Sequence, residues 1–258
     1  MQTIDRAVSI LQAVAQAPAG LTLSELSRQT GLAPATCHRL LSSLATSAMV
    51  ERNDTTKRWR PGLGLVRIAG SVSPAAGWGS LVDPVLVELR DHWQECFYFS
   101  NLTDGQVVCV RSVETTEPHR ISVSVPLGRR MSLHASAAAK AILAHITEDE
   151  ARRLLESIHL EQFTSYTLPT PDDVLRDLAA TRDRGFAVCD QEMELGVAAY
   201  AAAIPGPPGE APRSLGVIGH RERLGARMRA GLLDALLTAA EELSGATGAG
   251  LQPRALAW

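Results

Sequence analysis

The chain has 258 residues, a length that favours one large domain or two domains of ordinary size. Hydrophobic residues make up 45% and charged residues 21% of the chain, which is close to globular usage and excludes an intrinsically disordered protein. No apolar run approaches the roughly 18–20 residues that a membrane-spanning helix needs. The start of the chain has no basic region followed by an apolar segment and a cleavage site, so we expect a cytoplasmic protein with no membrane partner.

The cysteines give no sign of a disulfide framework or a zinc site. Cys37, Cys96, Cys109 and Cys189 lie far apart, and no two of them form a C-x2-C pair. We expect reduced thiols that serve mainly in packing.

Charge is distributed unevenly along the chain. Residues 1–70 carry eight Lys and Arg against four acids, a net charge of +4, whereas the whole chain has a net charge of −3. Residues 71–258 therefore carry a net charge of −7. A basic module joined to an acidic body is expected when the first part meets a polyanion and the second does not.

Three helices are predicted in the basic module. Apolar residues recur at helical spacing over residues 4–15. Thr22 with Glu25 forms a capping-box pattern at the start of a short second helix, and Gly31 follows that helix at the position that favours a left-handed backbone. Pro34 stands where the first residue of a third helix belongs.

The third helix carries two interleaved stripes. Its apolar stripe is Cys37, Leu40, Leu41 and Leu44. A polar, cationic stripe on the opposite side is typical of a recognition helix whose first turns enter the major groove of DNA. This second stripe comprises Ala35, His38, Arg39 and Ser42, and Thr36 can join it.

A basic hairpin is predicted after this helix. Residues 49–52 and 58–60 are typical of two short strands, and the turn-forming residues 53–56 separate them. The whole module is therefore predicted to be a winged helix-turn-helix. Small helical units with exposed arginines also occur in proteins that do not bind nucleic acid. Here the helices, the turn, the hairpin and the positive charge together favour DNA binding.

Three segments of this module are distinctive: the pattern Ile-Asp-Arg-Ala-Val-x-Ile-Leu of residues 4–11, LTLSELSRQTGLAPATCHRLLSSLATSAMVERN, and RWRPGLGLVRIAG. With these segments the module resembles the N-terminal domain of IclR-family transcriptional regulators. Ala33 stands where the family usually has a hydroxyl cap, and Pro61-Gly62 where it usually has Leu-Gly. The resemblance implies base or phosphate contacts from the third helix and phosphate contacts from the wing. The DNA-binding residues so implied are Thr36, His38, Arg39, Ser42, Lys57, Arg58 and Arg60.

The second part of the chain mixes helices and strands. Asp104-Gly105 is a tight turn between two predicted strands, which favours a hairpin and a largely antiparallel sheet in an α+β domain. The predicted strands are residues 96–102, 106–113, 121–125, 186–190, 197–204 and 214–218. Helices are predicted over residues 81–92 and 136–143, from Thr147, from Thr170 to Arg184, and as one long helix over residues 223–244.

Two segments of this part resemble the effector domain of the same family. They are SLHASAAAKAILA and RGFAVCDQEMELGVAAYAAAI. The resemblance implies a GAF-like fold and the following organisation: a winged helix-turn-helix domain at 1–70, a linker at 71–80, a GAF-like effector-binding and oligomerisation domain at 81–250 and a tail at 251–258.

The resemblance also implies an effector cavity. Its predicted lining is Ala137, Ala138, Cys189, Glu192 and Ala199, with His134 and Ser136 near the mouth. The chain departs from the family at Ala139, Cys189 and Ala199, where many members have Gly, an acid and Cys, so no relative's effector can be transferred. Simple core packing is the alternative role for each alanine.

No catalytic constellation is evident. Asp190, Glu192 and Glu194 alternate, so in a strand they would share one face and could hold a hard cation, although such a run is more often a solvated edge. His134 and Ser136 lie two residues apart, but neither a G-x-S-x-G pattern nor an orienting carboxylate accompanies them. We expect no enzyme activity, no metal and no cofactor.

The resulting hypothesis is a ligand-responsive, sequence-specific transcriptional repressor. Specific binding to double-stranded operator DNA calls for two or more copies, and the resemblance implies a homodimer or a dimer of dimers. The resemblance also implies a small-molecule effector, such as a small organic acid. A metabolic enzyme with an accessory winged helix and a protein-binding adaptor are the alternatives.

Overall fold

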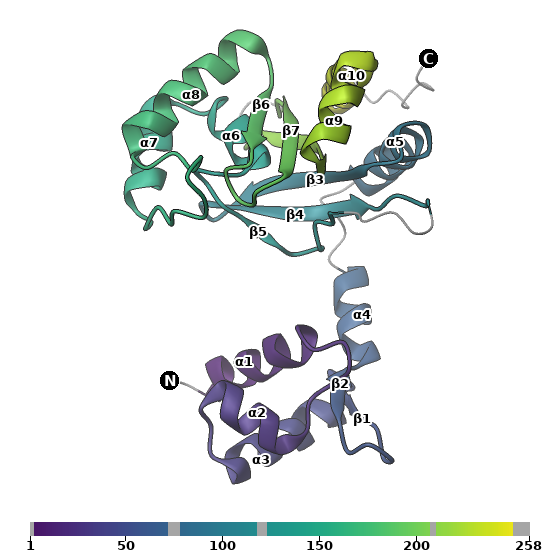
Figure 1. The fold of residues 1–258 in the computed structure, drawn as a ribbon. Coiled ribbons are helices and arrows are strands. Elements are labelled where there is room, and N and C mark those ends of the chain that lie inside the picture. Colours follow the sequence, from purple (N-terminus) through teal and green to yellow (C-terminus); the bar gives the residue numbers. More distant parts are fainter. Residues whose placement is uncertain (1–2, 72–77, 118–122, 207–209, 250–258) are drawn as a thin grey trace. The chain divides into compact units, whose positions relative to one another are not determined.

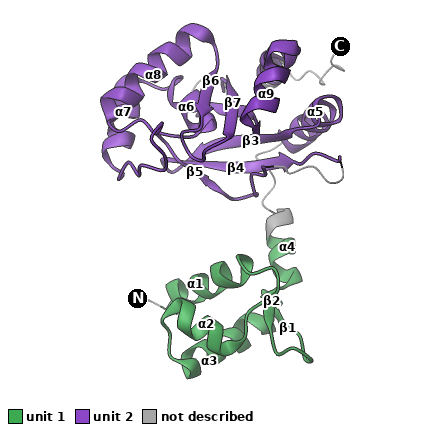
Figure 2. Ribbon diagram, viewed as in Figure 1, with its two compact units in different colours: residues 1–76 green, residues 77–258 purple. Residues whose placement is uncertain are grey.

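The computed structural model describes residues 3–71, 78–117, 123–206 and 210–249, and the chain divides into two compact units, residues 1–76 and 77–258 (Figure 2). Among the described helices, none is long and apolar enough to cross a membrane. The predicted linker and tail fall partly or wholly outside the described residues, and the domain limits remain a prediction.

Unit 1 is a winged helix-turn-helix (Figure 1). The apolar stripes of its first three helices meet the wing residues Val50 and Trp59 in one core. Its elements are α1 (Thr3–Ala15), α2 (Leu23–Thr30), α3 (Pro34–Thr46), β1 (Val50–Arg52), β2 (Trp59–Pro61) and α4 (Leu63–Ser71). Helix α4 was not expected from the sequence.

Local sequence signals set the ends of these helices. Thr22 and Glu25 form the predicted capping box at the start of α2, and Gly31 ends the helix at φ 68°. Helix α3 has Pro34 in its first turn, and Ala33 gives it no side-chain cap. These predictions of helix boundaries are confirmed.

Unit 2 is an α+β domain built on one antiparallel sheet, as predicted (Figure 1). The six described strands lie in the order β5-β4-β3-β8-β7-β6, and all of their pairings are antiparallel. The strands are β3 (Cys96–Thr103), β4 (Gln106–Val113), β5 (Arg130–Met131), β6 (Ala187–Asp190), β7 (Val197–Ile204) and β8 (Arg213–His220).

Helices cover both faces of this sheet. Those packing on one face are α5 (Trp78–Trp93), α9 (Arg221–Arg227) and α10 (Leu233–Ala249). Those packing on the other are α6 (Ala137–Leu143), α7 (Glu148–Glu156) and α8 (Pro171–Arg184). Alternate residues of the central strands contribute to the apolar cores on the two faces, as expected for an antiparallel sheet that is buried on both sides.

Two expectations about unit 2 are wrong. Residues 123–125 of the expected strand 121–125 form no strand, and residues 121–122 lie outside the described residues. The edge of β4 is occupied instead by the segment leading into β5, because Cys109 N donates to Arg129 O at 3.0 Å and Gly128 N donates to Cys109 O at 2.8 Å.

The expected long helix over residues 223–244 is also interrupted. A π-helical turn over Met228–Leu232 separates α9 from α10, and Gly231 within it has φ 111°. An L-residue with a side chain rarely adopts this conformation, so Gly231 explains the break.

Small residues on the sheet face toward α6 make room for one large ring. Tyr98 on β3 lies opposite Gly216 on β8, and a Cβ at Gly216 would lie 2.4 Å from the Tyr98 ring. Because Tyr98 is buried in the core, its ring has little freedom to move away.

Gly216→Ala is therefore expected to lower the free energy of unfolding by about 1–3 kcal/mol, the usual cost of overpacking a core. Gly225→Ala in α9 is the matched control, because its Cβ would meet only the Arg229 guanidinium at 3.8 Å. That variant should be neutral or stabilising by up to about 1 kcal/mol. Urea unfolding of both variants measures the difference, and equal midpoints would contradict the packing argument.

Candidate functional site

Helix α3 presents a polar face to solvent. Its side chains at Ala35, His38, Arg39 and Ser42 are exposed, and Thr36 is half-buried. Cys37, Leu40 and Leu41 are buried on the opposite side. Among the described residues, neither His38 nor Arg39 has an ion-pair partner, so both side chains are available to an external ligand such as DNA.

The wing is closed by a defined turn. The Asn53 Oδ1 accepts hydrogen bonds from Thr55 N at 3.0 Å and from Thr56 N at 2.8 Å, and Asn53 O accepts one from Lys57 N at 2.8 Å. Lys57 adopts φ 58° at this turn, and its side chain and that of Arg60 are exposed. Two of the predicted phosphate-binding side chains thus project from an ordered hairpin.

Arg58, the third wing residue predicted to bind phosphate, makes contacts within the unit. Its Nη1 donates to Gly20 O at 2.7 Å and to Glu25 Oε2 at 3.1 Å, and its Nη2 donates to Glu25 Oε1 at 3.4 Å. Glu25 is also held by Thr22, whose backbone N–H and hydroxyl lower the pKa of this carboxyl. Arg58 therefore fastens the wing to the start of α2.

Backbone pairing reinforces this attachment. Leu21 and Trp59 exchange two hydrogen bonds of 3.0 and 2.7 Å, so β2 pairs with the turn that precedes α2. Gly20 has φ 75°, and a Cβ there would lie 2.8 Å from Trp59 O. The wing is consequently fixed relative to α2 by main chain and side chain together.

Three of the predicted effector residues come together in unit 2. Ala137, Cys189 and Ala199 belong to one buried cluster between α6 and the strands β6 and β7, and Ala138 belongs to the neighbouring core. Burial raises the pKa of the Cys189 thiol to about 11, so the thiol stays protonated at neutral pH. These small side chains pack against one another as core residues do.

His134 and Ser136 make hydrogen bonds at and just before the N-terminus of α6. Ser136 Oγ accepts from Ala139 N at 3.2 Å as the N-cap of the helix and donates to Ser132 O at 2.7 Å. His134 lies between Ser132 Oγ, 3.1 Å from Nδ1, and Glu161 O, 3.0 Å from Nε2, and burial lowers its pKa. The two side chains do not bond each other, so they form no base–nucleophile pair.

Glu192, the remaining predicted effector residue, belongs to a buried charge cluster. The ammonium group of Lys140, 1% exposed, lies 2.6 Å from Glu192 Oε1 and 2.9 Å from Asp177 Oδ2. Burial raises the pKa of Glu192 to about 7, although the Lys140 charge acts to lower it. Its second oxygen, Oε2, has no hydrogen-bond partner among the described residues.

The expected common face of Asp190, Glu192 and Glu194 does not form. Strand β6 ends at Asp190, and Gln191 has φ 61°, which turns the chain. Asp190 pairs with Arg221, and no group of three potential metal ligands occurs among the described residues.

Two hydroxyls that the sequence analysis missed lie on the same sheet face. Ser100 on β3 and Ser214 on β8 are directly opposite each other, both are fully buried, and neither Oγ has a hydrogen-bond partner among the described residues. An unpaired buried hydroxyl costs about 1–3 kcal/mol, so each of these two hydroxyls retains the capacity to bind another polar group. The signal in the sequence is a serine on the buried face of each apolar strand.

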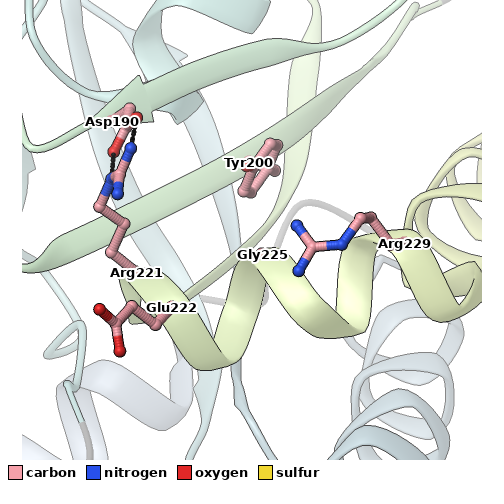
Figure 3. A pocket seen from close by; sticks show the side chains of 6 residues that line it. All are labelled: Asp190, Tyr200, Arg221, Glu222, Gly225 and Arg229. Atoms are coloured by element: carbon pink, nitrogen blue, oxygen red, sulfur yellow. Dashed lines mark hydrogen bonds and ion pairs between the residues drawn. The ribbon is translucent and has the colours of Figure 1, made fainter.

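A polar hollow of about 320 Å³ lies beside strand β6 (Figure 3). Arg221 forms a bidentate pair with Asp190, with distances of 2.6 Å from Nε and 3.1 Å from Nη2. Tyr200, Glu222, Gly225 and Arg229 complete the lining. Two acids balance two arginines here, so the hollow carries no net charge that would select an anionic effector.

Family models match both units. The model described as bacterial transcriptional regulator IclR C-terminal matches residues 79–245, and that described as IclR helix-turn-helix domain matches residues 3–54.

Individual relatives are similar over most of the chain. The HTH-type transcriptional regulator BhcR of Paracoccus denitrificans is 33% identical over 95% of this chain and 86% of its own. The transcriptional repressor IclR of Escherichia coli is 30% identical over 79% of this chain and 74% of its own. A solved IclR homologue from Microbacterium hydrocarbonoxydans, complexed with 4-hydroxybenzoate, has the same fold, with a TM-score of 0.81 at 19% identity over 96% of this chain and all of its own.

The internal contacts of Arg58 predict a distinctive salt dependence of DNA binding. Arg58→Gln should weaken binding by displacing the wing, yet leave the slope of log K against log salt unchanged, because no phosphate contact is lost. Lys57→Gln should flatten this slope by about 1. Titrations of a duplex at several salt concentrations measure both slopes. If Arg58→Gln flattens the slope as Lys57→Gln does, Arg58 contacts a phosphate.

Burial of Glu192 predicts a pH-dependent stability. A carboxyl whose pKa is raised in the folded protein stabilises it fully below the unfolded value of 4.5, and this contribution is lost as the pH rises through about 7. Between about pH 5.5 and 8 the parent should lose about 1–2 kcal/mol of stability that Glu192→Gln does not lose. Urea midpoints at the two pH values test this; parallel changes in parent and variant would contradict it.

Proposed function

The chain belongs to the IclR family of transcriptional regulators, and from this premise we propose that it is an oligomeric repressor whose operator binding is controlled by a small-molecule effector. Unit 1 supplies DNA binding and unit 2 is the effector-binding domain of the family. The observation that carries the proposal is the exposed His38 and Arg39 on α3 together with an ordered basic wing.

We propose that α3 reads base edges and that the wing contacts the DNA backbone. A guanidinium such as that of Arg39 can bind the O6 and N7 atoms of guanine with two hydrogen bonds, whereas Lys57 and Arg60 suit phosphates. Thr36, His38 and Ser42 complete the proposed DNA-facing surface of α3. Arg58 contributes by positioning the wing.

We propose that the regulator works as a homodimer or a dimer of dimers. One winged helix buries little surface and reads few base pairs, so a specific operator needs at least two copies related by symmetry. A ligand changes operator affinity only if it binds the two arrangements of the oligomer with different affinity.

The proposed effector site lies on the sheet face beneath α6. The unpaired hydroxyls of Ser100 and Ser214 support this position, and the predicted residues Ala137, Cys189 and Ala199 pack on the same face. That the homologue from Microbacterium hydrocarbonoxydans was solved with 4-hydroxybenzoate is consistent with a small organic acid as the effector class here. Ala138, Glu192, His134 and Ser136 would support this site from its surroundings rather than bind the effector directly.

We propose no catalytic role for unit 2. His134 and Ser136 are both engaged in bonds at the start of α6, and the relatives named above are transcriptional regulators. Turnover of a candidate effector, followed by mass spectrometry, would instead favour the enzyme alternative.

Arg39→Ala is expected to remove sequence preference rather than DNA binding in general. Loss of a bidentate guanine contact should cost about 1–3 kcal/mol on a specific operator and little on a scrambled duplex. Lys57→Ala is the matched control, because loss of a phosphate contact should weaken binding to both duplexes alike. Competition titrations with the two duplexes give the ratio; an Arg39→Ala protein that keeps the parent's ratio would contradict the proposed contact.

A further inference from the structure

Two charged side chains in the hollow beside β6 have no partner among the described residues. Glu222 and Arg229 are exposed, line this hollow, and make no hydrogen bond or ion pair with any other residue that the structure describes. The other two charged residues of the lining, Asp190 and Arg221, neutralise each other in their bidentate pair. The hollow therefore presents one unpaired negative group and one unpaired positive group on the same surface.

These two charges are placed symmetrically about small residues. Glu222 and Arg229 lie toward opposite ends of α9 and the turn that follows it, with Gly225 between them (Figure 3). The midpoint of the two positions falls between Gly225 and Ala226, so no bulky side chain there keeps a second helix at a distance. When two copies of such a helix run antiparallel about a two-fold axis through this midpoint, the negative end of each faces the positive end of the other.

The sheet beside α9 is uncovered at its edge strand. In β6, Ala187 and Cys189 are buried on the face toward α6, whereas Val188 and Asp190 on the opposite face are only half-buried. Among the described residues, no member of β6 belongs to the apolar core beneath α5, α9 and α10. Tyr200 on β7, also half-buried, lines the same hollow. These side chains retain surface that a second molecule can cover.

A second copy of this chain is the partner that satisfies these features together. An anionic partner would place a like charge against Glu222, and a cationic partner would place one against Arg229. Two copies of the same surface instead pair both charges, and they do so twice. Leu195, 65% exposed, adds apolar surface at the start of α9, because the neighbouring Gly196 O accepts a hydrogen bond of 2.8 Å from Arg221 N.

From these observations we infer that two copies of unit 2 associate through α9 about a two-fold axis, with Glu222 of each copy paired with the partner's Arg229. The inference rests on the oligomeric state proposed above. It goes beyond that proposal because it assigns a contact surface and the pairing of charges across it.

Charge reversal in the full-length protein tests this pairing. Sedimentation equilibrium measures the dissociation constant of each assembly step. Glu222→Arg and Arg229→Glu each place like charges opposite each other twice, so each should raise one of these constants by about tenfold or more. The double variant Glu222→Arg/Arg229→Glu restores opposite charges at both contacts and should associate as the parent does. Glu241→Arg on α10 is the matched control, because this exposed acid does not line the hollow, and it should leave association unchanged.

Cysteine crosslinking locates the two-fold axis independently. The four native cysteines are buried, so the folded parent should not react with a short bismaleimide. Ala226→Cys introduces an exposed thiol beside the midpoint and should crosslink efficiently to its counterpart in the second copy. Ala180→Cys, an equally exposed helical position on α8, is the matched control and should not crosslink.

The possible failures are distinguishable. The α9 contact is overturned, and the proposed oligomeric repressor is not, if the parent is oligomeric but tolerates both single reversals, or if the double reversal fails to restore association. Crosslinking of Ala180→Cys as efficient as that of Ala226→Cys would also overturn it. A parent that is monomeric at micromolar concentration would overturn both this contact and the proposed oligomer.

Discussion

The carboxylate of Glu25 holds the parts of the DNA-binding unit in register. It accepts hydrogen bonds from the backbone and hydroxyl of Thr22, which starts α2, and it pairs with Arg58 on the wing. The capping box is a local interaction, whereas the pair with Arg58 joins segments 33 residues apart. In the proposed complex the wing and α3 contact DNA together, so the position of the wing relative to α2 determines whether both can bind at once.

A second buried ionic centre organises the effector domain. Lys140 on α6 binds Glu192 in the loop after β6 and Asp177 on α8, so three elements converge on one ammonium group. Such a cluster is costly to desolvate and is tolerated only when each charge has a partner. Thr167 Oγ1 also donates to the main-chain oxygen of Glu192, so the segment before α8 is attached to this cluster.

Interactions between near neighbours in sequence were predictable, and interactions between distant segments were not. Thr22 and Gly31 mark helix ends through local backbone chemistry, and the two stripes of α3 follow from its spacing alone. The internal partners of Arg58 depend on tertiary folding, whereas the family resemblance implied only a phosphate contact for this residue. Ser100 and Ser214 become neighbours only through the pairing of β3 with β8, which no local pattern reveals. The apolar spacing over residues 223–244 predicts one continuous helix, but Gly231 within it adopts φ 111° and breaks the helix.

Selection from random duplex DNA measures whether this chain binds a specific DNA sequence as a symmetric oligomer. Full-length protein, shown to be folded, is incubated with a random-sequence library at near-physiological salt, and the retained duplexes are sequenced over successive rounds. We expect enrichment of one motif with two half-sites related by two-fold symmetry. Retention of duplexes without any enriched sequence would contradict this expectation.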